Sequence, residues 1–219
     1  ILATHDRLRA RDIGLNVLDA LNAAREVALS RAAAYADVVM PGYTHLQSAQ
    51  PISYGHYLSA VAQAMARDAG RIEQAIVNMD ASPLGAGALA GTAFPIQREE
   101  TARLLGFSGC VENSLDAVAS RDFAWELMSA MTIASLTWGR IAQDFYVWAT
   151  PEFGLIEFPD SVAGTSSIMP QKKNPVVVEY LKGKTSHLIG LLTAAMSAVK
   201  GTHFTHSGDG NRESMRSFW

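Results

Sequence analysis

The chain has 219 residues, of which 48% are hydrophobic, and its 18 basic and 21 acidic side chains give a formal net charge of -3. The balanced, scattered charge excludes the electrostatic pattern of proteins that bind nucleic acid or anionic membrane surfaces. No uninterrupted apolar run approaches the roughly 20 residues that span a bilayer, so we expect a globular protein with neither partner.

The cysteine content indicates a reducing compartment. Cys110 is the single cysteine, so an internal disulfide is excluded, and the chain has no Asn-x-Ser/Thr acceptor. Both features favour the cytoplasm. The chain starts at Ile1 with no basic-then-apolar segment after it, so no secretory signal is expected. Cys110 is expected to be a packed or idle thiol, because no His or Asn pattern lies near it.

The N-terminal third predicts two helices with a loop between them. A long amphipathic helix is predicted over residues 7–35, because apolar residues recur at three- and four-residue steps. Residues 38–49 contain Pro41-Gly42 and several polar groups, which predicts a loop. A second helix is predicted from Pro51, a favoured first-turn residue, to about Met79.

A turn rich in Gly and Ala is predicted over residues 81–95. It does not match the dinucleotide-binding fingerprint, because three residues separate its second and third Gly and no strand precedes it. A short helix over residues 97–105 follows, ended by Gly106. These features favour close packing of the backbone over phosphate binding.

A single long helix is predicted over residues 115–148, capped by Asn113 or Ser114, with an apolar face along its whole length. Another helix is predicted over residues 176–199, and no segment predicts a confident strand. Long helices need partners along their length, so we expect an all-α, long-helix bundle in which an oligomer shares a helical core. We expect residues 1–200 to form this helical-bundle domain and residues 201–219 to be an irregular segment leading to a further C-terminal part.

Residues 164–175 (GTSSIMPQKKNP) suit proton chemistry beside a carboxylate. A serine hydroxyl acts as a base only where positive charge and oriented dipoles stabilise its alkoxide. Lys172 and Asn174 can supply both, and can hold a substrate carboxylate as it gains negative charge. By composition alone, an ordinary polar loop that caps a helix is the favoured interpretation.

The full string matches the signature Ser-Ser-x-Met-Pro-x-Lys-x-Asn of the fumarase/aspartase superfamily. It most resembles the argininosuccinate lyase branch, and residues 40–51 (MPGYTHLQSAQP) resemble a second signature of that branch. Residues 82–98 and 113–122 also resemble it, so the similarity runs from about Ala33 to His187. Lyases of this family are considerably longer, so we expect the chain to be part of a longer protein.

The resemblance implies a role for each matching residue. Ser166 would be the base that removes a proton from the carbon beside a substrate carboxylate, and Lys172 would contact the developing charge. His45 would protonate the departing amine, and Glu179 would orient that imidazole, since an anion raises its proton affinity and fixes its tautomer. The remaining substrate-side or positioning residues implied are Thr44, Asn174, Ser167, Gln50, Arg98, Ser82 and His5. A solvated helix position is the alternative for Glu179.

Three positions depart from the family pattern. The chain has Ala3-Thr4-His5-Asp6 where the family usually carries Ser-Arg-Asn-Asp, and Thr165 where Gly is usual. Residues 205–209 replace a usual Tyr-Asn-Lys-Asp segment. The proton-abstraction half of the site therefore matches, whereas the amine-recognition half differs.

The resemblance implies a lyase that eliminates an amine from an N-substituted aspartate, such as argininosuccinate, to give fumarate without a metal or cofactor. The partners implied are a small dicarboxylate or aspartate adduct and further copies of the chain, in a homotetramer whose active sites draw residues from three subunits. Two alternatives remain open. One is a lyase of the same fold with another adduct, including C–O cleavage, and the other is a structural protein resembling a lens crystallin without activity.

Overall fold

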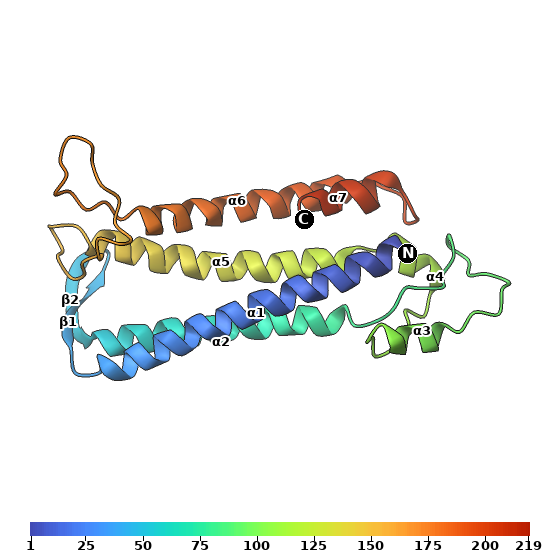
Figure 1. The fold of residues 1–219 in the computed structure, drawn as a ribbon, viewed down its shortest axis with the longest axis horizontal. Helices are drawn as coiled ribbons and strands as arrows, with labels where there is room; N and C mark the ends of the chain where they lie inside the picture. The colour runs from blue at the N-terminus through green and yellow to red at the C-terminus, as the bar shows by residue number, and fades with distance from the viewer. The chain divides into compact units, whose positions relative to one another are not determined.

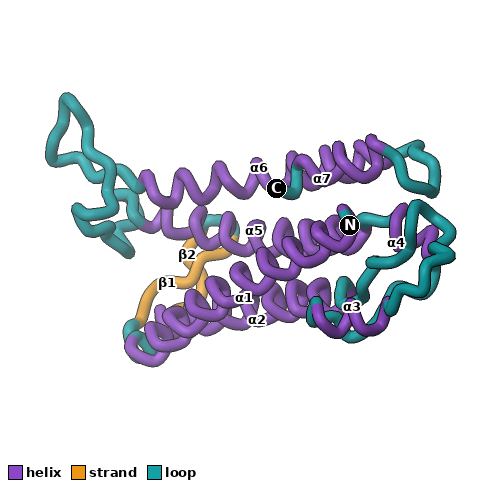
Figure 2. Tube along the Cα trace, turned by 45° about the vertical axis from the view of Figure 1, so that its right-hand side comes forward, coloured by secondary structure: helices purple, strands orange, loops and turns teal.

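A computed structural model describes all 219 residues, and these divide into two compact units. Unit 1 comprises residues 1–20, 69–132 and 189–219, and unit 2 comprises residues 21–68 and 133–188. The predicted all-α class is confirmed, because every element is helical apart from one pair of strands (Figures 1 and 2). No helix is long and apolar enough to cross a membrane. The helices are α1 (Leu2–Ala34), α2 (Tyr54–Asn78), α3 (Arg98–Leu104), α4 (Ser114–Ala119), α5 (Asp122–Trp148), α6 (Val176–Val199), the π-helix η1 (Asp209–Glu213) and α7 (Ser214–Arg216).

Arginines of α1 hold the loops of unit 1. The Nη1 atom of Arg7 donates a hydrogen bond to the carbonyl of Met79 at 2.9 Å. The guanidinium of Arg11 donates to the carbonyls of Gly106 and Leu105 at 2.7 and 3.1 Å. These carbonyls follow the C-terminal end of α3, where backbone acceptors lack helical partners. The first turns of α1 therefore fix both the end of α2 and the end of α3.

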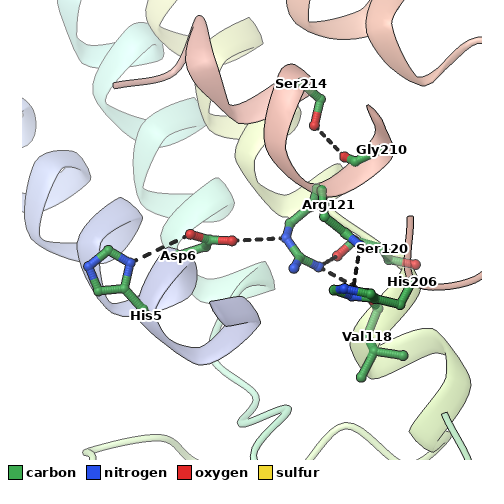
Figure 3. A network of polar contacts seen from close by, with 9 residues as sticks. His5, Asp6, Val118, Ser120, Arg121, His206, Gly210 and Ser214 are labelled. Atoms are coloured by element: carbon green, nitrogen blue, oxygen red, sulfur yellow. Dashed lines mark hydrogen bonds and ion pairs between the residues drawn. The ribbon is translucent and has the colours of Figure 1, made fainter. Parts of the chain in front are cut away.

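The predicted single helix over residues 115–148 is wrong, because α4 ends at Ala119 and α5 begins at Asp122. Between them Ser120 is extended, with φ -90° and ψ 140°. Arg121 is 1% exposed, and its Nε donates to Asp6 Oδ2 at 3.0 Å. Its Nη1 donates to the carbonyls of Val118 and Ser120 at 3.3 and 2.8 Å (Figure 3). A buried arginine thus donates hydrogen bonds to the carbonyls at the break between α4 and α5. No Gly or Pro in the sequence marks this break.

In unit 2 an aromatic group joins α2 to α5. The Tyr57 hydroxyl donates to Asp144 Oδ2 at 2.8 Å, and its ring meets that of Trp148 at 4.6 Å in an edge contact. Burial, together with the hydrogen bond to Asp144, raises the pKa of Tyr57. The helices α5 and α6 approach closely at Gly139, where an added Cβ would lie 3.0 Å from the Thr185 hydroxyl.

Residues 38–49, predicted to be a loop, instead form most of an antiparallel hairpin of β1 (Val39–Thr44) and β2 (Gln47–Ser53). The expectation of no strand is therefore wrong here. Pro41 and Pro51 face each other, and proline is tolerated because a two-stranded sheet consists of edge strands. The register shifts between Pro41 and Tyr43, where a Cβ on Gly42 would meet the Gln50 carbonyl oxygen at 2.6 Å. The sequence predicted a loop here because the prolines and the tight turn interrupt the alternating pattern that is typical of strands.

Other boundaries lie near the predicted ones. The first, short and last long helices are confirmed within a few residues of 7–35, 97–105 and 176–199. The second begins at Tyr54 rather than Pro51, because β2 runs to Ser53. Residues 209–216 form helical turns within the segment predicted to be irregular. The division at residue 200 stays a prediction.

We expect Arg121→Met to lower the free energy of unfolding of the protein that contains this chain by about 3–5 kcal/mol, because Asp6 would keep a buried, unpaired charge. Urea unfolding measures the change. Adding Asp6→Leu should recover part of the loss, and Arg9→Met, at an exposed position, serves as the control. A loss below about 1 kcal/mol would show that the pair is not the support described.

Candidate active site

The predicted site residues fall into both units. Unit 2 holds the hairpin with His45 and the segment 164–174, here called the signature loop, together with Glu179 at the start of α6. Unit 1 holds Arg98 and His5. In unit 2 the hairpin and the loop between α5 and α6 lie at the same end of the helices (Figure 1). The two segments assigned opposite roles in proton transfer are therefore neighbours in the fold of that unit.

His45 occupies the tip of the hairpin in a strained backbone conformation. Its φ is 55° and that of Leu46 is 58°, the positive values of a two-residue hairpin turn. Such turns usually carry Asn or Gly, and positive φ at other residues costs on the order of 1–3 kcal/mol each. The His45 side chain is exposed and makes no hydrogen bond or ion pair. The side chains of Thr44 and Gln50 are likewise exposed and unpaired. The hairpin therefore presents a free imidazole.

The signature loop is closed at its neck by the backbone. The amide of Gly164 donates to the carbonyl of Asn174, and the amide of Asn174 donates to the carbonyl of Gly164, both at 2.8 Å. A Cβ on Gly164 would lie 2.5 Å from Val176 Cγ1, so only glycine fits. The signature loop is thus tied at its neck to the first turn of α6.

Ser166 is half-buried inside this loop. Its Oγ accepts hydrogen bonds from the amides of Ile168 and Met169 at 3.3 and 3.2 Å. Two backbone donors on one hydroxyl oxygen favour its anionic form. Lys172 and Ser167 are exposed and unpaired, while the Asn174 amide reaches the Thr165 carbonyl at 3.5 Å. The loop therefore gathers the hydroxyl, the amide and the ammonium on one short segment.

Glu179 lies on an open groove of about 510 Å³ on α6, whose lining also includes Lys184 and His187. The Glu179 carboxylate is exposed and makes no hydrogen bond or ion pair. It is not bonded to His45 within the chain, so the pairing of these two residues stays a prediction.

In unit 1 the guanidinium of Arg98 supports the Gly-rich turn. Its Nε and Nη2 donate to the carbonyls of Leu84 and Val111 at 3.1 and 2.9 Å. The buried Ser82 hydroxyl accepts from the Leu84 amide at 3.3 Å. The exposed His5 ring lies 3.6 Å from Asp6 Oδ1. Arg98 is therefore engaged with the backbone, whereas His5 remains open to solvent.

A cavity of about 470 Å³ in unit 1 is lined by segments that differ from the family pattern. Ala3 and Thr4 line it, and so does His206 from the segment 205–209. The Nδ1 atom of His206 lies 3.0 Å from Asn211 Nδ2. Two segments about 200 residues apart in the sequence therefore meet around one space. No three His, Cys, Asp or Glu side chains of the chain are grouped as metal ligands.

Sequence reasoning missed Lys173. Its ammonium lies 2.5 Å from Glu157 Oε1 and 2.8 Å from Asp160 Oδ1. The lysine stands inside the signature string, but its partners precede it by more than ten residues in a segment without periodicity. Only the fold shows that they meet.

Comparison with known proteins gives a consistent result. A family model described as lyase matches residues 1–190. Argininosuccinate lyase 1 of Shouchella clausii is 45% identical over 219 residues, which cover 100% of this chain and 44% of that protein. Argininosuccinate lyase of Thermus thermophilus is 46% identical over 210 residues, which cover 95% of this chain and 46% of that protein.

Solved structures of an EDDS lyase are also similar. The complex with formate has a TM-score of 0.92 and a variant with bound fumarate has 0.91. Both are 32% identical and cover 99% of this chain and 46% of the other. The chain spans less than half the length of the relatives it matches. The family resemblance drawn from the two signatures is confirmed.

We expect Gly164→Ala to lower turnover by at least about tenfold, because the new Cβ would collide with Val176 and open the neck of the loop. Steady-state rates of the purified full-length protein measure this. Gly70→Ala, at an exposed position of α2, is the matched control, since a Cβ there meets nothing within 4 Å. Equal rates for both variants would contradict the role assigned to the neck.

Proposed function

The chain belongs to the lyase family of the fumarase/aspartase superfamily, in its argininosuccinate lyase-like branch, and we propose that the protein containing it is a carbon–nitrogen lyase. Its reaction is elimination of an amine from an N-substituted aspartate to give fumarate. The observation that carries this proposal is the Ser166 hydroxyl, held by two backbone amides in a closed loop that also bears Lys172 and Asn174. The names of the relatives, and the fumarate bound to the EDDS lyase variant, support the reaction class.

In the proposed mechanism, Ser166 takes a proton from the carbon beside a substrate carboxylate. The electron pair moves into that carboxylate, where Lys172 and Asn174 stabilise the added negative charge. The pair then forms the double bond of fumarate as the carbon–nitrogen bond breaks. The leaving amine takes a proton from His45. Each proton removed or delivered thus has a named group.

The leaving amine is not specified by these residues. Argininosuccinate is the substrate named by the relatives. The cavity of unit 1, lined by the two segments that differ from the family pattern, favours a second candidate, in which the same chemistry releases another amine. Fumarate absorbance with a series of aspartate adducts separates the two, and the absence of fumarate from every adduct would favour an inactive structural homologue.

We also propose that the protein is a homotetramer in the cytoplasm whose active sites are shared between subunits. In unit 2, α5 exposes Ile133 and Leu136, and α6 exposes Val177, Tyr180 and Leu188. Large exposed apolar patches are uncommon on monomers, so these helix faces favour burial against further copies. The cytoplasmic location rests on the single cysteine.

Ser166→Ala is expected to abolish turnover and leave the fold intact, since a half-buried loop hydroxyl contributes little to packing. Loss of a general base typically costs about 10²- to 10⁴-fold. Fumarate absorbance measures the rate, and circular dichroism checks the fold. Ser197→Ala, at an exposed position of α6, is the control. Near-normal turnover of Ser166→Ala would remove it from the role of base.

Mixed oligomers test whether the sites are shared. We expect Ser166→Ala and His45→Asn chains to be inactive alone, and co-refolded mixtures to regain part of the activity. The reason is that some sites would then receive an intact serine from one subunit and an intact histidine from another. Native mass spectrometry verifies that mixed tetramers form. If they form and stay inactive, or if the protein is a monomer, the shared-site proposal is wrong.

A further inference from the structure

One segment of unit 2 touches both the His45 hairpin and the signature loop. It comprises residues 153–160, between α5 and the signature loop, and is called the brace here. At its start the Phe153 ring meets the Tyr43 ring of β1, with centroids 5.2 Å apart and a 58° angle between planes. At its end Glu157 and Asp160 both pair with Lys173. The brace therefore connects the segments that carry the proposed acid and base.

The backbone fixes the start of the brace to α5. The amide of Gly154 donates to the carbonyl of Thr150 at 2.7 Å, and the amide of Leu155 donates to that of Trp148 at 3.0 Å. Gly154 has φ 57°, the left-handed conformation that commonly ends a helix. The start of the brace is therefore fixed to the end of α5. A contact at its other end can then hold the signature loop in place, rather than move together with that loop.

Lys173 holds the other end of the brace. It lies between Lys172 and Asn174, the two residues proposed to contact the substrate carboxylate, and next to the hydrogen-bonded neck. Hydrogen bonds with Asp160 and Glu157 raise the pKa of the Lys173 ammonium, so it keeps its charge. Lys172 has no such partner and stays free. One lysine is thus tied to the protein, while its neighbour remains available.

We propose that the brace positions the signature loop against the hairpin, and that Lys173 is the positioning residue through which it acts. This inference rests on the proposed function. Exposed ion pairs contribute little to global stability, so the effect falls on loop geometry rather than on folding. Geometry matters because a displacement of about 1 Å in a site can cost about 10²-fold in rate.

The central test compares Lys173→Met with Lys173→Arg in the full-length protein. We expect Lys173→Met to lower kcat by roughly tenfold, with KM changed by less than about threefold, and to speed amide hydrogen exchange over residues 164–174. Lys173→Arg keeps the positive charge, so it should retain most of the wild-type kcat and of the slow hydrogen exchange. Lys200→Met, at an exposed lysine without an ion pair, is the control.

Two further arms test the connection itself. The double variant Glu157→Gln/Asp160→Asn should show the same loss of kcat and the same faster exchange as Lys173→Met. The triple variant should lose no more than the double variant or Lys173→Met alone, because all of these changes remove the same contact. Raising ionic strength from about 0.01 to 1 M should slow the wild type more than Lys173→Met, since salt screens exposed pairs. Phe153→Leu should speed exchange in residues 39–53, with the exposed Phe204→Leu as control.

Unchanged exchange over residues 164–174 in Lys173→Met would overturn the proposal. So would additive losses in the triple variant, or equal impairment by Lys173→Arg. If the wild type releases no fumarate from any adduct, the proposed function fails, and hydrogen exchange alone then decides whether the brace holds the loop.

Discussion

The proposed chemistry depends on the two hydrogen bonds between Gly164 and Asn174. They turn a polar stretch into a closed loop, and they leave the Ile168 and Met169 amides directed at the Ser166 oxygen. A loop of this composition has no apolar core of its own, so its shape comes from the backbone and from its neighbours. The close fit of Gly164 against Val176 explains why the neck lies where α6 begins.

The helices and the irregular segments have different roles in this chain. Helices α1, α2, α5 and α6 supply most of the buried apolar residues, whereas the positive φ angles of His45 and Leu46 lie at the hairpin tip. Strain of this kind persists only where the surrounding structure holds it. The hairpin has such support on the β1 side, from the contact of Tyr43 with Phe153. The helices therefore supply most of the core, and the hairpin and signature loop carry the groups proposed to react.

The sequence predicted most of the long helices closely, and the predicted bounds of α6 match residue for residue. The prediction of helix bounds failed where a side chain distant in the sequence determines where a helix ends. Arg121 ends α4 by taking its carbonyls while pairing with Asp6, which lies 115 residues away. The two strands were not predicted, because their prolines interrupt the alternation of apolar and polar residues that is typical of a strand. Ser166 and His45 were predicted from the signature strings and stay predictions, whereas the ion pairs of Lys173 involve partners that only the fold brings near.

The groups of the proposed site differ in how completely one chain satisfies them. Ser166 has its two donors, but His45 and Glu179 have no partner in the chain, although both are exposed and in the same unit. An imidazole that must deliver a proton gains from a fixed tautomer, which a free ring at a hairpin tip lacks. In the proposed mechanism, the partner of His45 would come from another copy or from the rest of the protein. The exposed apolar faces of α5 and α6 favour another copy, because burying them would bring a second chain against the groove that holds Glu179. Association and catalysis would then depend on the same surfaces.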